Sequence, residues 1–257
     1  MREVVNMMNS KAIFLGGLIS LANVASAGII NFEAGPKCSL LHDNSELSIH
    51  DSFQTNGVSV KFGFDTNNDG SIDSPAVFEQ VGNKDKKNDT GFWGIGGAKD
   101  VAAPGYESQL GNYFLRQSRP YKPFGTFTIL YDSEEAVTAA SGEIWDIDGN
   151  KRKTEQFLVE AFNEETLLEA IESPLGNNMT LDGKPWTFGF NNLIDITKIE
   201  ISFIGTKTSG IGLAFNNFSP IQNIQRASQV SVPEPGSIVI LAFGILGIAA
   251  RCSLSKQ

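Results

Sequence analysis

The densest group of acidic and amide side chains lies between Asp65 and Asp73, in the segment Asp-Thr-Asn-Asn-Asp-Gly-Ser-Ile-Asp. Ca²⁺ takes six to eight hard oxygen ligands, and alternate residues of a tight loop can converge on one ion. Five residues match the alternating positions of an EF-hand-type loop, with Gly70 at the sharp turn: Asp65, Asn67, Asp69, Ser71 through its carbonyl, and Asp73. The segment is thus a candidate for a calcium site, which would be weak, structural and of the extracellular kind.

The same segment has a second interpretation. The position where an EF-hand has its bidentate glutamate is Ala76, preceded by Pro75, and no helical pattern flanks the loop. Asn, Asp and Gly are also the residues that favour a tight turn between two strands. An ordinary acidic hairpin loop therefore remains the alternative to a calcium site.

Asp146 and Asp148 form a second acidic pair, at alternate positions in Trp-Asp-Ile-Asp-Gly. On a strand they lie on one face, and paired carboxylates can perform acid–base chemistry on a glycosidic bond. We favour the simpler interpretation, in which they lie on the solvent face of a strand that ends in a Gly149-Asn150 turn. No catalytic residue is predicted, and the protein is expected not to be an enzyme.

The remaining composition excludes several function classes. His42 and His50 are the two histidines, and neither lies near a nucleophilic serine motif or a metal-ligand spacing, so a triad hydrolase and a zinc enzyme are disfavoured. The net charge of −9 argues against nucleic-acid binding, which needs a basic face. Trp93, followed by glycines in Trp-Gly-Ile-Gly-Gly, is the best candidate for an exposed ring on which a sugar could stack.

Short strand-like runs separated by turn residues predict the elements that position these groups. In the run 196–204, Ile199, Ile201 and Phe203 alternate with polar residues, which is typical of a half-buried strand. Similar runs occupy 29–33, 58–64, 113–116, 126–131, 142–147, 156–162, 186–190 and 211–218. Residues 28–230 are therefore expected to form one β-sandwich domain.

Two further expectations concern residues 163–173 and Cys38. Residues 163–173 fit either a short helix or a hairpin whose loop is 163–166, and we favour the hairpin because Pro174 ends the apolar run early. Cys38 is the single cysteine of the domain and is expected to be a small buried hydrophobe.

Residues 1–27 have the features of a secretory signal peptide. Arg2 and Lys11 supply positive charge, an apolar run follows over 12–24, and Ala25-Ser26-Ala27 is a small-residue cleavage pattern. Cleavage after Ala27 would leave Gly28 as the new N-terminus.

Residues 231–257 contain Val232-Pro233-Glu234-Pro235, an apolar run over 238–250, and Arg251. The run alone makes only about 20 Å of helix, but counting residues 235–252 gives about 27 Å. That is enough for a marginal transmembrane helix, which we expect over 236–250. This arrangement resembles the PEP-CTERM sorting signal, although a single arginine stands where a basic cluster is usual. The resemblance implies export, transient anchoring in the inner membrane, and processing by an exosortase-type peptidase.

Four further segments carry a second resemblance: Gly142–Gly149, Thr154–Gln156, Leu181–Trp186 and Ile211–Phe218. They look like the jelly-roll domains often found before this sorting signal, which are similar in architecture to carbohydrate-binding modules. The last strand of those domains often reads Ala-Phe-Asp-Asn, and Asn216 replaces that aspartate here, which puts a calcium site at that strand in doubt.

Together these observations predict an all-β, jelly-roll β-sandwich between a signal peptide and a C-terminal single transmembrane helix. The expected function is that of an exported, non-catalytic protein of the cell surface or extracellular matrix, with exopolysaccharide as a candidate ligand. The expected partners are the secretion machinery and an exosortase-type peptidase. A calcium-dependent glycan-binding module and a polysaccharide-active enzyme using strand carboxylates are the alternatives.

Overall fold

This computed structural model describes residues 28–55, 57–82, 93–94, 98–99, 101–118, 125–133, 136–177, 181–208 and 211–222. Within them the chain is almost entirely β. The strands are β1 (Ser45–Leu47), β2 (Phe53–Thr55), β3 (Val58–Asp65), β4 (Ser74–Gln80), β5 (Trp93–Gly94), β6 (Ala98–Lys99), β7 (Tyr113–Arg116), β8 (Thr126–Asp132), β9 (Val137–Trp145), β10 (Gly149–Asn150), β11 (Lys153–Thr154), β12 (Phe157–Asn163), β13 (Thr166–Glu172), β14 (Pro185–Phe190), β15 (Lys198–Phe203) and β16 (Ala214–Gln222). The described helical segments are a 3₁₀ turn, Pro36–Cys38, and α1 (Glu107–Leu110).

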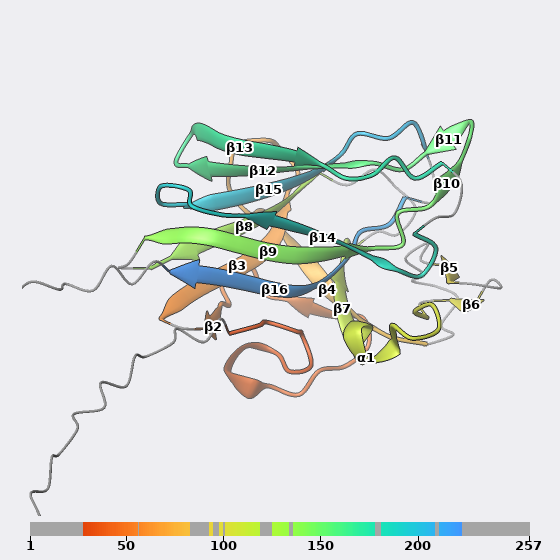
Figure 1. The fold of residues 1–257 in the computed structure, drawn as a ribbon. Coiled ribbons are helices and arrows are strands. Elements are labelled where there is room, and N and C mark those ends of the chain that lie inside the picture. Colours follow the sequence, from red (N-terminus) through yellow and green to blue (C-terminus); the bar gives the residue numbers. More distant parts are fainter. Residues whose placement is uncertain are drawn as a thin grey trace, which may run out of the picture.

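The strands form two layers, as Figure 1 shows. One layer has the order β13-β12-β15-β8-β3, with β2 beside β3. The other has the order β4-β7-β16-β9-β14, with β1 beside β4. The layers join where the end of β3 pairs with the start of β4, at Gly63–Pro75 and Phe64–Ser74. The predicted all-β sandwich is therefore confirmed.

From β7 onward the chain mostly alternates between the two layers, which is the crossing pattern typical of jelly-roll sandwiches. Among the described strands of this part, β12–β13 is the one hairpin within a layer, and it pairs Asn163 with Thr166. The hairpin interpretation of residues 163–173 is thus confirmed, and Glu164 takes the left-handed conformation that the tight turn requires.

The core lies between the layers and is rich in phenylalanine. Alternate residues of β3 point inward, so that Val58, Val60, Phe62 and Phe64 are buried, as the period-two pattern predicts. Phe62 contacts Phe215 and Phe218 of the opposite layer, with ring centroids 6.0 and 5.5 Å apart. Burial of these rings is the main contribution to stability of the fold.

Strand β16 contains an irregularity that matters for the site. Its register with β9 shifts between Asn216 and Ser219, and Asn217 adopts a positive φ of 50°. This bulge directs both Phe215 and Phe218 into the core. Beside it, Ile30 forms a two-bond bridge with Phe218, with N–O distances of 2.7 and 2.9 Å, so the start of the described chain lies against its last strand.

One packing expectation is wrong. Cys38 is exposed rather than buried, because it closes the 3₁₀ turn on the surface in a left-handed conformation. Residues 1–27 and 223–257 lie outside the described residues, as does the predicted transmembrane segment 236–250.

Candidate functional site

The Asp65–Asp73 loop connects β3 to β4 and is held together by its own carboxylates. Asp65, at the buried end of β3, accepts backbone N–H groups of Asn67, Asn68 and Asp69 on Oδ1, at 3.2, 2.6 and 3.3 Å. Its Oδ2 accepts the N–H of Gly70 at 2.7 Å. A carboxylate that accepts several N–H donors in this way helps to fix the turn.

The other two acidic side chains of this loop also have local partners. Asp69 accepts the backbone N–H of Ser71 at 2.9 Å and its hydroxyl, and these hydrogen bonds lower the pKa of Asp69 below its usual value. Asp73 accepts the Thr66 hydroxyl at 2.8 Å and its N–H at 3.1 Å. These contacts are those of the hairpin-loop alternative, and calcium binding by this loop stays a prediction.

A different group of carboxylates converges at the far end of β9. One oxygen of each of Asp146, Asp148 and Asp182 lies within 4.8 Å of the others, which makes them a group of possible metal ligands among the described residues. Asp146 and Asp182 are 6% and 8% exposed, while Asp148 is half-buried and opens to solvent. The three residues come from two segments that are far apart in the sequence.

The predicted strand geometry of this segment is wrong. β9 ends at Trp145, and Asp146 has a positive φ of 61°, so Asp146 and Asp148 do not occupy the solvent face of a strand. Asp146 turns inward and accepts the N–H of Gly183 at 2.9 Å, while its own N–H donates to the Lys184 carbonyl at 3.1 Å. These contacts tie the end of β9 to the turn that precedes β14 and bring Asp182 to the group.

A fourth carboxylate and one ammonium border the group. Glu155 is 3% exposed, and its Oε2 accepts the N–H of Asp148 at 3.2 Å. Lys207 Nζ lies 2.6 Å from Glu155 Oε1 and 3.7 Å from Asp148 Oδ1. Neither residue was singled out from the sequence, because no spacing rule links positions 155 and 207.

Burial dominates the electrostatics there. Desolvation raises the pKa of Glu155 to about 7, although Lys207 opposes the rise. Burial, followed by the charge of Asp148, raises the pKa of Asp182, and burial likewise raises that of Asp148. Burial acts to lower the pKa of Lys207, but attraction to the surrounding carboxylates outweighs it and raises that pKa. Negative charge in this group is therefore only partly compensated.

Two glycines permit the close packing that assembles the group. A Cβ on Gly176 would lie 2.5 Å from the Asp148 carbonyl oxygen and 2.8 Å from that of Ile147. Gly149, with a φ of +141°, would place a Cβ 2.5 Å from the Gly176 carbonyl. Backbone hydrogen bonds between Glu155 and Gly176, at 3.0 and 2.8 Å, complete the contact.

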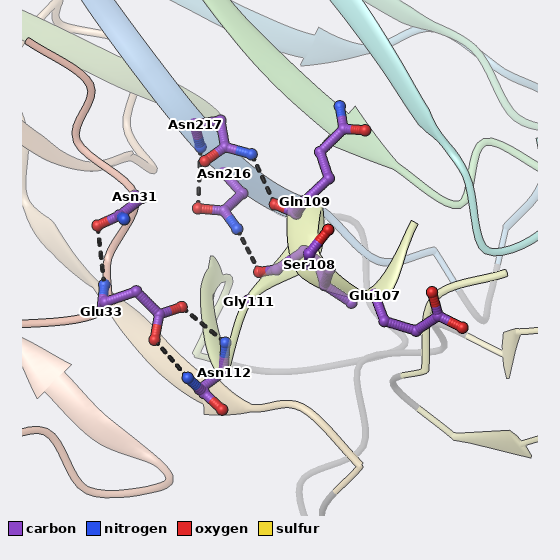
Figure 2. A pocket seen from close by; sticks show the side chains of 10 residues that line it. Asn31, Glu33, Glu107, Ser108, Gln109, Gly111, Asn112, Asn216 and Asn217 are labelled. Carbon is purple, nitrogen blue, oxygen red and sulfur yellow. Dashed lines mark hydrogen bonds between the residues drawn. The ribbon is translucent and has the colours of Figure 1, made fainter. Parts of the chain in front are cut away.

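A separate polar pocket of about 620 Å³ lies beside α1 and the bulge of β16 (Figure 2). The described residues that line it carry mostly amide, hydroxyl and carboxylate groups and include no aromatic ring: Asn31, Glu33, Glu107, Ser108, Gln109, Leu110, Gly111, Asn112, Asn216 and Asn217.

Hydrogen bonds brace the walls of this pocket. Asn216 donates to the Leu110 carbonyl at 2.6 Å, and Asn217 donates to that of Gln109 at 2.7 Å. Glu33 accepts the N–H and the side-chain amide of Asn112, at 2.6 and 2.7 Å. The side-chain amide of Asn216, which replaces the aspartate of the resembling domains, thus donates to a backbone carbonyl. The described walls of the pocket are thus polar and fixed by hydrogen bonds.

The remaining predicted residues are placed as follows. His42 and His50 are both exposed. The backbone of Trp93 pairs with that of Lys99, but its side chain lies outside the described residues. The cleavage residues Ala25 and Ala27 and the motif residues Val232, Pro233, Glu234, Pro235 and Arg251 lie outside them too.

Comparison with known proteins decides the nature of the C-terminal segment. Residues 231–253 match the family model of the PEP-CTERM protein-sorting motif. The chain carries a PEP-CTERM sorting signal. Such a signal marks an exported protein that is transiently anchored in the membrane and sorted by an exosortase. It begins nine residues after the last residue of β16, Gln222.

No curated protein matches the chain. Within the described residues, no helix has the length and apolarity needed to cross a membrane.

Proposed function

We infer that this PEP-CTERM protein is a non-catalytic component of the cell surface or extracellular matrix, delivered by the secretion machinery and released by an exosortase-type peptidase. The observation that carries this proposal is the sorting signal at 231–253, placed directly after a folded β-sandwich. The sandwich is the domain that is exported, and the signal directs its sorting. The overall charge of −9 suits a soluble exposed domain.

Processing can be tested in a host that makes an exosortase. The full chain is compared with a Pro233→Ala/Glu234→Ala variant, and Gln229→Ala, which lies just outside the matched residues, is the control. We expect the unmodified chain and the control to reach the surface or matrix fraction in a shortened form. The motif variant should remain in the membrane fraction at full length. Equal processing of all three would contradict exosortase sorting.

The polar pocket of Figure 2 is the proposed place of contact with exopolysaccharide. Its braced amide walls support this assignment, because a polyol ligand needs fixed hydrogen-bonding groups. Affinity electrophoresis of the full-length protein in gels containing the host polysaccharide measures binding. Ser108→Trp, which fills the pocket, should abolish retardation, whereas the exposed Asp132→Asn should leave it unchanged.

The same samples test the absence of catalysis. Asp146 is nine-tenths buried and bonded to Gly183, which supports a structural rather than a catalytic role for this carboxylate. We expect no release of reducing ends from the polysaccharide. Turnover that Asp146→Asn abolished would establish the carboxylate enzyme instead.

A further inference from the structure

We propose that Asp146, Asp148 and Asp182 bind a hard divalent cation, of which Ca²⁺ is the one expected outside the cell. The proposal is independent of the sorting function. It rests on three carboxylates whose oxygens lie within 4.8 Å of one another and come from the end of β9 and the turn before β14. Carboxylate oxygens are the ligands that Ca²⁺ prefers.

A buried oxygen without a partner is the second, independent observation. Oδ1 of Asp182 is shielded from solvent and has no hydrogen-bond partner among the described residues. The side chain is 8% exposed and belongs to the convergent group. Buried polar atoms are nearly always paired, because an unpaired one forfeits its interaction with water. A cation held between the three carboxylates supplies the missing partner.

The charge balance leads to the same conclusion. Four carboxylates meet here, counting Glu155, and Lys207 lies within 4 Å of two of them. Lys184 attracts Asp182 from one side. Like charges in a poorly solvated site repel strongly unless an opposite charge lies between them. A divalent ion offsets the carboxylates that the lysines leave uncompensated.

The site is also open on one side and rigid on the other. Asp148 and Lys207 retain about a fifth of their side-chain exposure, which leaves a route for the ion and its remaining water ligands. The contacts around Gly176, and the bond from Gly183 to Asp146, fix the backbone that carries the ligands. A weak, structural affinity, with half-saturation near 0.1–1 mM, is expected for such an extracellular site.

The test is thermal unfolding of the full chain, purified in mild detergent, during a CaCl₂ titration and in EDTA. An ion that binds only the folded state raises the melting temperature in a saturable way. The decisive variants are Asp182→Asn and Asp148→Asn, with Asp69→Asn in the β3–β4 loop and the exposed Asp132→Asn as matched controls. We expect each cluster variant to weaken calcium binding at least tenfold and both controls to keep the wild-type response.

The behaviour in EDTA separates a cation site from a merely structural carboxylate. Asp182→Asn removes one of the repelling charges, so its melting temperature in EDTA should equal or exceed that of wild type. A large loss of stability in EDTA would show that Asp182 stabilises the fold by itself and would overturn the proposal. The absence of any calcium shift, or a shift lost in Asp69→Asn and kept in Asp182→Asn, would overturn it too.

Discussion

The two acidic regions of this sandwich differ in where their hydrogen-bond donors come from. In the Asp65–Asp73 loop every acidic side chain accepts N–H or O–H groups from the loop itself. In the Asp146–Asp148–Asp182 cluster the acids come from two distant segments, and one oxygen of Asp182 has no donor among the residues that the structure describes. A contiguous acidic motif can thus satisfy itself, whereas a group assembled by the fold can leave charge for a ligand to balance.

The largest loss of stability is expected from a substitution in the Asp65–Asp73 loop. Asp65→Ala leaves the N–H groups that Asp65 now accepts without their partner, at a position that is 2% exposed. The free energy of unfolding should fall by about 3 kcal/mol, since several backbone N–H groups lose a charge-assisted bond to this buried carboxylate. Urea unfolding with and without EDTA measures it. The same loss is expected in both; a loss confined to calcium-containing buffer would make the loop a metal site.

A bulky residue at the packing contact should weaken the cluster. Gly176→Ala places a Cβ against the Asp148 and Ile147 carbonyls, so the backbone of residues 147–148 must move away. We expect a loss of about 2 kcal/mol, as for other overpacked positions. Gly189→Ala, whose Cβ would meet nothing closer than 3.9 Å, is the control and should be tolerated. Equal stability of both variants in urea would show that the cluster does not depend on this close approach.

The pH dependence of stability should have opposite signs in the two regions. Burial raises the pKa of Glu155 to about 7, so the folded state holds a proton that the unfolded state releases near pH 4.5. The resulting stabilisation is fully present below pH 4.5 and is lost as the pH rises through 7, by an amount on the order of 2 kcal/mol. Chemical unfolding in EDTA from pH 4 to 8 measures this loss, and Glu155→Gln should remove it.

Asp69 provides the contrasting case. Its pKa is lowered by its bonds to Ser71, so its contribution is present above its usual pKa and is lost only as the pH falls further. Asp69→Asn should therefore leave the change in unfolding free energy between pH 4.5 and 7 the same as in wild type. If Asp69→Asn and Glu155→Gln altered the same window, the electrostatic distinction between the two regions would be wrong.

The smallest effect is expected at the turn of the loop. Gly70 has a φ of +83°, and a Cβ there would lie 3.4 Å from the nearest atom, Lys198 Nζ. Gly70→Ala therefore encounters backbone strain rather than a clash and should cost about 1 kcal/mol. Thermal unfolding detects this change. A cost as large as that of Asp65→Ala would mean that the turn, and not its carboxylate, holds the loop.

Local patterns predicted the fold well and the site poorly. The alternation of Val58 to Phe64 indicates one buried face, and β3 has that face. The hairpin at residues 163–166 follows from a short apolar run stopped by Pro174. Both depend on neighbours in the sequence, so they can be recognised there.

The acidic cluster depends on contacts that local patterns do not encode. The Trp-Asp-Ile-Asp segment alternates like a strand, but Asp146 turns inward to accept the N–H of Gly183, and β9 ends at Trp145, two residues before the expected end of the strand. Asp182 and Glu155 lie in segments that resemble other exported domains, but the sequence predicts no ligand role for either residue. No spacing predicts that residues 148, 155, 182 and 207 meet. Four segments resemble jelly-roll domains, and the fold brings three of them together here: Gly142–Gly149, Thr154–Gln156 and Leu181–Trp186.

The position of β16 has a mechanical consequence. This strand leads toward the membrane-directed signal, and it lies inside its layer, between β9 on one side and β7 with the Ile30 bridge on the other. Tension transmitted along the chain while the protein is tethered therefore acts in shear on hydrogen bonds at both margins of β16. An edge strand under the same load would peel away one bond at a time. The strand next to the tether is thus held along both of its margins for as long as the domain is anchored.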